Sequence, residues 1–465
     1  MKGPSLMTNN KAFLGTEPVG KLLFRLAIPT VLAQLVNMLY NVVDRIYIGH
    51  IEGVGNLALT GVGICMPLIM VVSAFAALVG AGGAPRASIF LGKGDKEQAE
   101  RVLSNCFTMQ LLMSAVLTAV LLLWSEDFLM AFGGSENTIP YAVDYMSIYA
   151  VGTLFVQLTL GMNAFITAQG FTKISMTSVL IGAVCNIALD PLFIFAFHMG
   201  VSGAALATVI SQALSCLWVM RFLLGKKTVL HIRRQYMPLQ LKTVLPCLAL
   251  GLAPFIMQSS ESMISMCFNS SLQTYGGDVA VGAMTILTSV MQFAMLPLQG
   301  FAQGAQPITS YNFGAGNKSR VLQSFRLLLT VSLTYSALLW GAIMLFPGVF
   351  ASIFTPDPTL LTFSASVLPV YLGALVIFGI QIACQMTFVA IGNAKASIIV
   401  AVVRKFVLLL PLIYIMPALM EDKTLAVYTA EPVADVIAVT FTAILFFFQF
   451  RKALRSMDKP AEKTA

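Results

Sequence analysis

Charged side chains are scarce in this sequence: they make up 10% of the residues, and only 3 of the 465 residues are histidine. Soluble domains carry about a quarter charged residues, so water cannot be the solvent for most of the surface. The 7 cysteines fall singly in apolar stretches, with no close pair and no cluster with histidine. This distribution excludes a disulfide framework and argues against a zinc site, and we expect no metal cofactor.

Long apolar runs take the place of the missing charge. Hydrophobic residues make up 58% of the chain, and uncharged runs such as Phe107–Trp124 and Val201–Met220 are about as long as a bilayer span. The pattern predicts an all-α integral membrane protein with twelve spans. They cover residues 21–48, 57–82, 100–124, 138–167, 173–197, 201–223, 243–272, 279–303, 321–346, 360–390, 396–418 and 430–450.

The basic residues predict the orientation of these spans. With the N-terminus in the cytoplasm, 24 of the 28 Lys and Arg residues lie on the cytoplasmic side, while nine of the 20 acids, Glu431 among them, are assigned to outer loops. This is the positive-inside bias, and it favours an even number of spans with both termini cytoplasmic. The net charge of +8 therefore faces anionic lipid, and no nucleic-acid partner is expected.

Two segments 222 residues apart have nearly the same sequence. Residues 82–96 read GGAPRASIFLGKGDK and residues 304–318 read GAQPITSYNFGAGNK. A constant offset predicts two six-helix lobes of the same orientation, related by a pseudo-twofold axis, with a central cavity between them. The predicted parts are a cytoplasmic tail (1–20), an N-terminal half (21–223), a cytoplasmic linker (224–242), a C-terminal half (243–450) and a second cytoplasmic tail (451–465).

The repeated segment is rich in glycine but does not match a nucleotide-binding loop. Gly92-Lys-Gly-Asp-Lys96 lacks the GxxxxGK[ST] spacing that a phosphate loop needs. Because the segment recurs in both halves and continues into the following loops, we interpret it as a structural turn, or else as a gating hinge.

Polar residues inside the predicted spans are costly to bury, so each is a functional candidate. Asp44, Asp190 and Thr208 all fall in the outer half of the membrane, and Asn186 lies one helical turn from Asp190. Two nearby carboxylates raise one another's proton affinity, and an all-oxygen set also suits a hard cation. The set predicts a proton or sodium site. The alternative is a structural role, in which buried acids are satisfied by the backbone or by a neighbouring arginine such as Arg45.

The other intramembrane polar residues have two interpretations each. Glu261, Arg404, Lys405 and Asp435 form either an ion-pair network or part of the transport path. Polar residues that can hydrogen-bond a ligand in a central cavity, or join helices to one another, are Gln34, Asn37, Asn41 and Asn163.

As a set, these residues resemble the multidrug and toxic compound extrusion (MATE) family of prokaryotic efflux transporters. The resemblance covers residues 15–450 and lies in Ile28-Pro29 followed by Asp44, the repeated Gly/Pro segments, Gly161-Met-Asn163, and Asn186-Ile-Ala-Leu-Asp190-Pro191. It implies twelve helices in two lobes around a V-shaped cavity. It also implies export of organic cations in exchange for inward H⁺ or Na⁺.

The resemblance further assigns individual residues. It places cation coupling at Asp44, Asn186, Asp190 and Thr208, ligand contacts at Asn163 and the acidic span-seven position at Glu261. It makes Pro29 a candidate for a helix bend. The sequence departs from some sodium-coupled members in span ten, where residues 360–391 contain no acid. This departure disfavours a sodium site centred there.

We therefore expect a cation-coupled multidrug antiporter, not an enzyme, with protons favoured over sodium and no cofactor beyond the coupling ion. Its partners would be small organic substrates and the bilayer, and it would act as a monomer in the bacterial cytoplasmic (inner) membrane. The alternative is a flippase for lipid-linked oligosaccharides or precursors from the same superfamily. Such a flippase would need basic residues in its cavity, and the spans contain only three. A channel would not explain the duplication or the paired acids.

Overall fold

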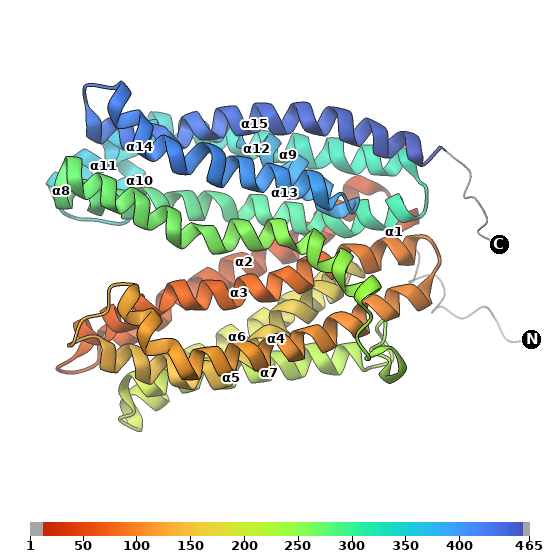
Figure 1. Ribbon diagram of the computed structural model, residues 1–465, viewed down its shortest axis with the longest axis horizontal. Coiled ribbons are helices and arrows are strands. Elements are labelled where there is room, and N and C mark those ends of the chain that lie inside the picture. Colours follow the sequence, from red (N-terminus) through yellow and green to blue (C-terminus); the bar gives the residue numbers. More distant parts are fainter. Residues whose placement is uncertain (1–12, 459–465) are drawn as a thin grey trace, which may run out of the picture.

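The computed structural model describes residues 13–458, so parts of both predicted tails lie outside the described residues. The described chain is helical, with no strand between residues 13 and 458 (Figure 1). Its first half contains α1 (Phe13–Thr16), α2 (Val19–Gly49), α3 (Gly55–Gly92), α4 (Lys96–Ala131), α5 (Ile139–Ala168), α6 (Thr172–Pro191), the π-helix η1 (Leu192–Ala196) and α7 (Gly200–Leu223).

A short 3₁₀-helix, η2 (Arg234–Tyr236), lies in the linker between the halves. The second half contains α8 (Leu241–Gly314), α9 (Lys318–Leu345), α10 (Pro347–Ser352), α11 (Pro358–Tyr371), α12 (Leu375–Ala390), α13 (Ala394–Val402), the π-helix η3 (Val403–Leu409), α14 (Leu410–Leu419) and α15 (Lys423–Ser456).

The helices account for the twelve predicted spans. Ten helical stretches of the described chain are long and apolar enough to cross a bilayer, and α11 with α12, bent by 53° between them, makes an eleventh. The twelfth comes from α8, whose 74 residues would be about 110 Å long if straight. Gly277 interrupts α8 with a φ of 67° and a ψ of −161°, and the chain reverses there. The chain is thus a multi-pass membrane protein.

The repeat seen in the sequence is also a repeat of backbone conformation. Gly94 and Gly316, 222 residues apart, have φ values of 79° and 74°, and Gly170 and Gly392 have values of 85° and 78°. Residues with a β-carbon rarely adopt positive φ, so the backbone of these turns requires glycine. The break at Gly277 matches Gly55, where α3 begins, which supports dividing α8 into two spans at this point.

The interpretation of the repeated segment as a turn is right only for its last residues. Helix α3 continues through Pro85 to Gly92, and the second copy continues as helix through Pro307 to Gly314. Only the residues around Gly94 and Gly316 form turns. The earlier glycines serve a different purpose, because they let two helices approach each other closely.

This approach joins the two halves. A β-carbon on Gly92 would overlap the carbonyl oxygen of Tyr311, and one on Gly314 would overlap the carbonyl oxygen of Ile89. The two contacts exchange partners under the 222-residue offset, as expected if the pseudo-twofold axis passes between them. Farther along the same interface, Gly82 meets Cys247. Apart from this interface, most of the apolar core divides into clusters that belong to one half or the other.

The linker between the halves is bound to the N-terminal half. The side chain of Asn105 on α4 donates to the carbonyl oxygen of Tyr236 at 2.8 Å and accepts from the amide of Gln240 at 2.7 Å. Glu100, which is buried on α4, accepts from Arg233 at 3.0 Å, and Gln169 at the end of α5 accepts from the backbone of Val229 at 2.8 Å. The linker therefore packs as part of the N-terminal half up to the start of α8.

The close backbone contact generates a prediction. Gly314→Ala places a methyl group against the backbone of α3, and overpacking of this kind costs about 1–3 kcal/mol. We expect a lower thermal unfolding midpoint in detergent. Gly341→Ala is the control, because a β-carbon there meets open space, and its midpoint should be unchanged or raised. Equal midpoints for the two variants would contradict the proposed contact.

Candidate functional site

The four residues predicted to form a cation site lie together in the N-terminal half. Asn186 and Asp190 lie one turn apart on α6, and the amide of Asn186 donates to Asp190 Oδ1 at 3.3 Å. The same amide lies 3.5 Å from Thr208 Oγ1 on α7. Asp44 reaches the group from α2, and its carboxyl lies close enough to the Asp190 carboxyl for the two groups to interact. We call these residues the N-half polar cluster.

The N-half polar cluster is held by three helices and shielded from solvent. Asn186 and Asp190 are buried, while Asp44 and Thr208 are partly exposed. The Thr208 hydroxyl also donates to the carbonyl of Ala204 at 3.0 Å, which fixes its rotamer on α7. Two neighbouring carboxyl groups bind one proton more readily than either would alone, so this arrangement provides a place for a proton.

Three oxygens of the cluster have no hydrogen-bond partner among the described residues. They are Asp44 Oδ1, Asn186 Oδ1 and Asp190 Oδ2, and all three are buried. Buried polar atoms are normally satisfied, so the three oxygens are available to a ligand. An all-oxygen set fits a proton or a hard monovalent cation. No group of three or more His, Cys, Asp or Glu side chains suited to a metal ion occurs between residues 13 and 458.

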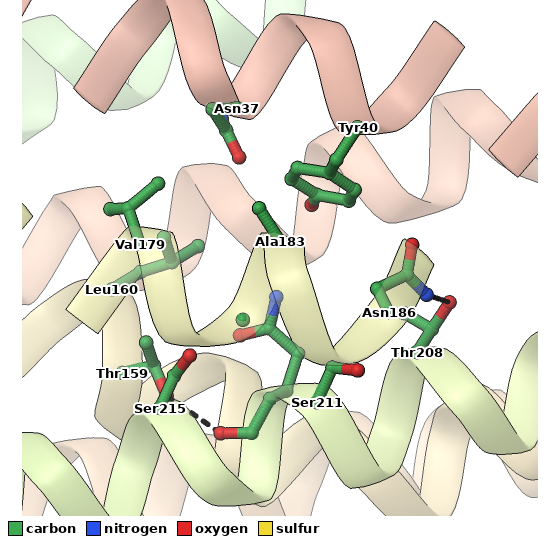
Figure 2. A pocket seen from close by; sticks show the side chains of 12 residues that line it. Asn37, Tyr40, Thr159, Leu160, Val179, Ala183, Asn186, Thr208, Ser211 and Ser215 are labelled. Atoms are coloured by element: carbon green, nitrogen blue, oxygen red, sulfur yellow. Dashed lines mark hydrogen bonds between the residues drawn. The ribbon is translucent and has the colours of Figure 1, made fainter. Parts of the chain in front are cut away.

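A polar pocket adjoins the cluster (Figure 2). Asn186 and Thr208 form part of its wall, and Asn37 and Tyr40 reach it from α2. The remaining lining residues come from α5, α6 and α7: Thr159, Leu160, Val179, Gly182, Ala183, Ser211, Gln212 and Ser215. The pocket has a volume of about 40 Å³, which is room for a few water molecules, so an organic ligand would lie beside the cluster only after the surrounding helices moved apart.

The other residues predicted to contact a ligand do not all line this pocket. Of the α2 residues, Asn37 lines the pocket, whereas Gln34 and Asn41 do not. Asn41 donates to the carbonyl of Asn37 at 2.8 Å within the same helix. Asn163 donates to the carbonyl of Ser175 at 3.3 Å and so links α5 to α6. Whether Gln34, Asn41 and Asn163 contact a substrate stays a prediction.

Glu261 and Pro29 lie elsewhere. Glu261 belongs to the C-terminal half and pairs with Lys405, so it is not part of the N-half pocket. Pro29 is buried inside α2, which runs without interruption from Val19 to Gly49. Its neighbour Thr30 donates to the carbonyl of Gly300 at 2.6 Å, which attaches this part of α2 to α8.

Two expectations from the sequence need correction, and some residues were missed. Glu431 does not lie in an outer loop: it is buried within α15 and pairs with Arg404 at 3.3 Å. Arg45 forms no ion pair in the described chain, so the alternative in which this arginine satisfies the buried acids is not supported. Besides the predicted Thr208, three α7 residues that line the pocket were missed, although their helical spacing marks a polar face: Ser211, Gln212 and Ser215.

Comparisons with known proteins agree on one family. The MatE family model matches residues 29–192 and 253–415. Among curated proteins, the chain is 24% identical to the multidrug export protein MepA of Staphylococcus haemolyticus over 86% of this chain and 87% of that protein. It is 23% identical to MepA of Staphylococcus aureus, over 87% of this chain and 88% of that protein.

Solved structures show the same fold. A crystal structure of MATE in the bent conformation matches with a TM-score of 0.90 and 22% identity, covering 98% of this chain and all of that chain. An outward-facing multidrug resistance MATE family transporter matches with a TM-score of 0.88 and 23% identity, covering 97% and 99%. A transporter from Pyrococcus furiosus matches with a TM-score of 0.86 and 24% identity at the same coverage.

The shared proton can be tested chemically. Hydrophobic carbodiimides react with protonated carboxyl groups in apolar surroundings, so we expect mass spectrometry to find modification on the peptides that contain Asp44 or Asp190. Asp190→Asn should remove most of it, whereas the exposed control Asp127→Asn should not. Modification confined to exposed carboxylates would contradict a shared proton at this site.

Proposed function

The chain belongs to the MatE family, and from that premise we propose that it is a secondary active multidrug exporter. It exports small organic compounds, mostly cationic or amphipathic, in exchange for protons that move inward. The observation that carries this proposal is the pair of neighbouring carboxyl groups, Asp44 and Asp190, beside a polar pocket. The multidrug export activity named for the staphylococcal relatives supports the substrate class.

The geometry suggests how the two ligands oppose each other. Asn186 and Thr208 belong both to the N-half polar cluster and to the wall of the pocket. A proton on Asp190 or Asp44 changes the charge of that wall, and a bound organic cation favours the unprotonated form. Linkage requires that each ligand lowers the affinity for the other by the same factor. This reciprocal effect is the thermodynamic basis of antiport.

The driving force is sufficient for export. One elementary charge moved through a membrane potential of 100 mV supplies about 2.3 kcal/mol. That energy corresponds to roughly a fiftyfold concentration gradient for a neutral substrate, whereas export of a monovalent cation costs the same electrical energy and therefore depends on the pH gradient or on a second proton. No further energy source such as ATP is required.

We favour protons over sodium because of the number of ligands. Sodium would need about five or six well-placed oxygens. The four side chains of the N-half polar cluster carry six, but Asp190 Oδ1 and Thr208 Oγ1 already accept from Asn186. A proton needs only one oxygen of the neighbouring carboxyl groups Asp44 and Asp190. In the proposed orientation, both termini and the linker are cytoplasmic, and the protein acts as a monomer in the bacterial inner membrane. The two halves, 21–223 and 243–450, are the proposed lobes.

The flippase alternative receives no support from the basic residues of the spans. A pyrophosphate head group would need free cations in the cavity, but Arg404 and Lys405 are both paired with carboxylates. Arg45, the third basic residue, is exposed near the end of α2.

Transport into proteoliposomes tests the proposal. A fluorescent organic cation should accumulate when a pH gradient is imposed across the membrane in the absence of sodium. Asp190→Asn removes the charge at nearly constant volume, so we expect transport to fall at least about tenfold, with Asp127→Asn as the control. Accumulation that requires a sodium gradient and ignores the pH gradient would overturn proton coupling. Absence of any organic-cation transport would overturn the function itself.

A further inference from the structure

A second cluster of ionised groups lies inside the C-terminal half. Arg404 and Lys405 are consecutive residues of the π-helix η3. The Arg404 guanidinium contacts Asp435 at 2.9 Å and Glu431 at 3.3 Å, both on α15. The Lys405 ammonium forms an ion pair with Glu261 on α8. We call these five residues the C-half charge cluster. Short π-helical segments often mark functional sites, and here the segment places two neighbouring cations inside the same bundle.

Only one member of the cluster is accessible. The Glu261 side chain is 54% exposed, whereas that of Lys405 is 4% exposed, and both acids on α15 are buried. The residue after Glu261, Ser262, contacts the sulfur of Met70 on α3, at 3.9 Å. This part of α8 therefore faces the N-terminal half. A carboxylate exposed to lipid would be costly, so the open side of Glu261 faces the space between the halves.

The charges of the cluster do not balance. Three carboxylates face two cations, and Arg404 alone contacts two of the carboxylates. Lys405 lies close enough to Glu431 for their charges to interact as well. Lys405 pairs only with Glu261 among the described residues, but a turn of its long side chain toward Glu431 would keep it from becoming an unpaired buried charge, which would be strongly unfavourable.

The duplication shows what the two cations replace. Under the 222-residue offset, Arg404 and Lys405 correspond to Gly182 and Ala183, which line the pocket of the N-terminal half. In the C-terminal half, therefore, two long basic side chains occupy the positions where the first half has a pocket. Of the two, Lys405 is the cation that pairs with the exposed carboxylate of Glu261.

The family resemblance already places Glu261 among the ligand contacts; we propose that Lys405 is a built-in competing cation, which pairs with Glu261 until the positive centre of a transported compound displaces it. When a substrate cation binds to Glu261, Lys405 moves toward Glu431 and Asp435, and the volume that it leaves becomes available to the substrate. The ligand class is organic cations with an ammonium or amidinium group attached to an apolar body. This inference rests on the proposed export function, but it concerns binding and does not depend on the coupling ion.

Competition has a consequence for selectivity. A ligand must replace an existing ion pair, so charge alone gives little net gain, and apolar contacts have to supply the remainder of the affinity. Small hydrated cations are therefore rejected, while large amphipathic cations are accepted. Neutral compounds of the same size do not engage Glu261 and are indifferent to Lys405.

Equilibrium binding to the purified full-length protein in detergent tests the proposal. The probes are ethidium, a fluorescent organic cation, and Nile red, a neutral dye of similar size. Lys405→Met removes the competing charge at similar length, and we expect ethidium to bind about tenfold more tightly. Glu261→Gln should weaken ethidium binding by a similar factor. Nile red binding should change in neither variant.

Further variants keep the result interpretable. Lys405→Arg preserves the charge and should bind ethidium like the unmodified chain, and Glu261→Gln/Lys405→Met, which removes both charges, should resemble Glu261→Gln alone. Unchanged or weaker ethidium binding by Lys405→Met, with Lys405→Arg folded normally, would overturn the proposal. An equal gain for Nile red would also overturn it, because it would indicate that only space had been created.

The test of Lys405 can be distinguished from the test of proton-coupled export. Asp190→Asn lies in the other half, so the effect of Lys405→Met on ethidium affinity should persist in the Asp190→Asn background even where transport is lost. Loss of transport with this binding effect intact would concern the coupling mechanism alone. Normal transport without the binding effect would overturn the role of Lys405 and leave the exporter intact.

Discussion

The contact between the backbones of α3 and α8 is the constraint on which the arrangement of the two halves depends. Gly92 lies against Tyr311 and Gly314 against Ile89, and the two contacts are exchanged by the 222-residue repeat. With no β-carbons between them, the helices approach closely at the end of the molecule where the linker lies (Figure 1). Each half must therefore present the same helix at the same level.

Although the two halves share this arrangement of helices, they carry different buried polar and charged residues on corresponding helices. The first half holds Asp44, Asn186, Asp190 and Thr208 on spans one, five and six. The second half holds its charge cluster on spans seven, eleven and twelve, with different residues at the matching positions. Where Gly182 and Ala183 leave a pocket, Arg404 and Lys405 fill the space. Duplication preserved the scaffold, while the polar positions diverged.

The cost of burying charge explains this difference. In the first half, two carboxyl groups lie together without a basic partner, so a proton or cation is the means by which their repulsion is relieved. In the second half, two basic side chains neutralise most of three carboxylates, and the network remains ionised without a ligand. The first arrangement suits reversible binding of a small cation. The second suits an exchange of partners, because each charge that moves has another partner nearby.

The sequence alone determined the membrane environment, the twelve spans, the duplication and the grouping of Asp44, Asn186, Asp190 and Thr208, because each is expressed in local composition or in a constant spacing. It could not show that the helix continues from Gly82 to Gly92, since the close packing of these glycines depends on partners more than 160 residues away. Nor could it place Glu431 inside the bundle, because a charged residue near the end of an apolar run is normally assigned to a loop. Its partner Arg404, which makes burial possible, is seen only in the structure. Such pairings between distant segments are decided only by the tertiary structure.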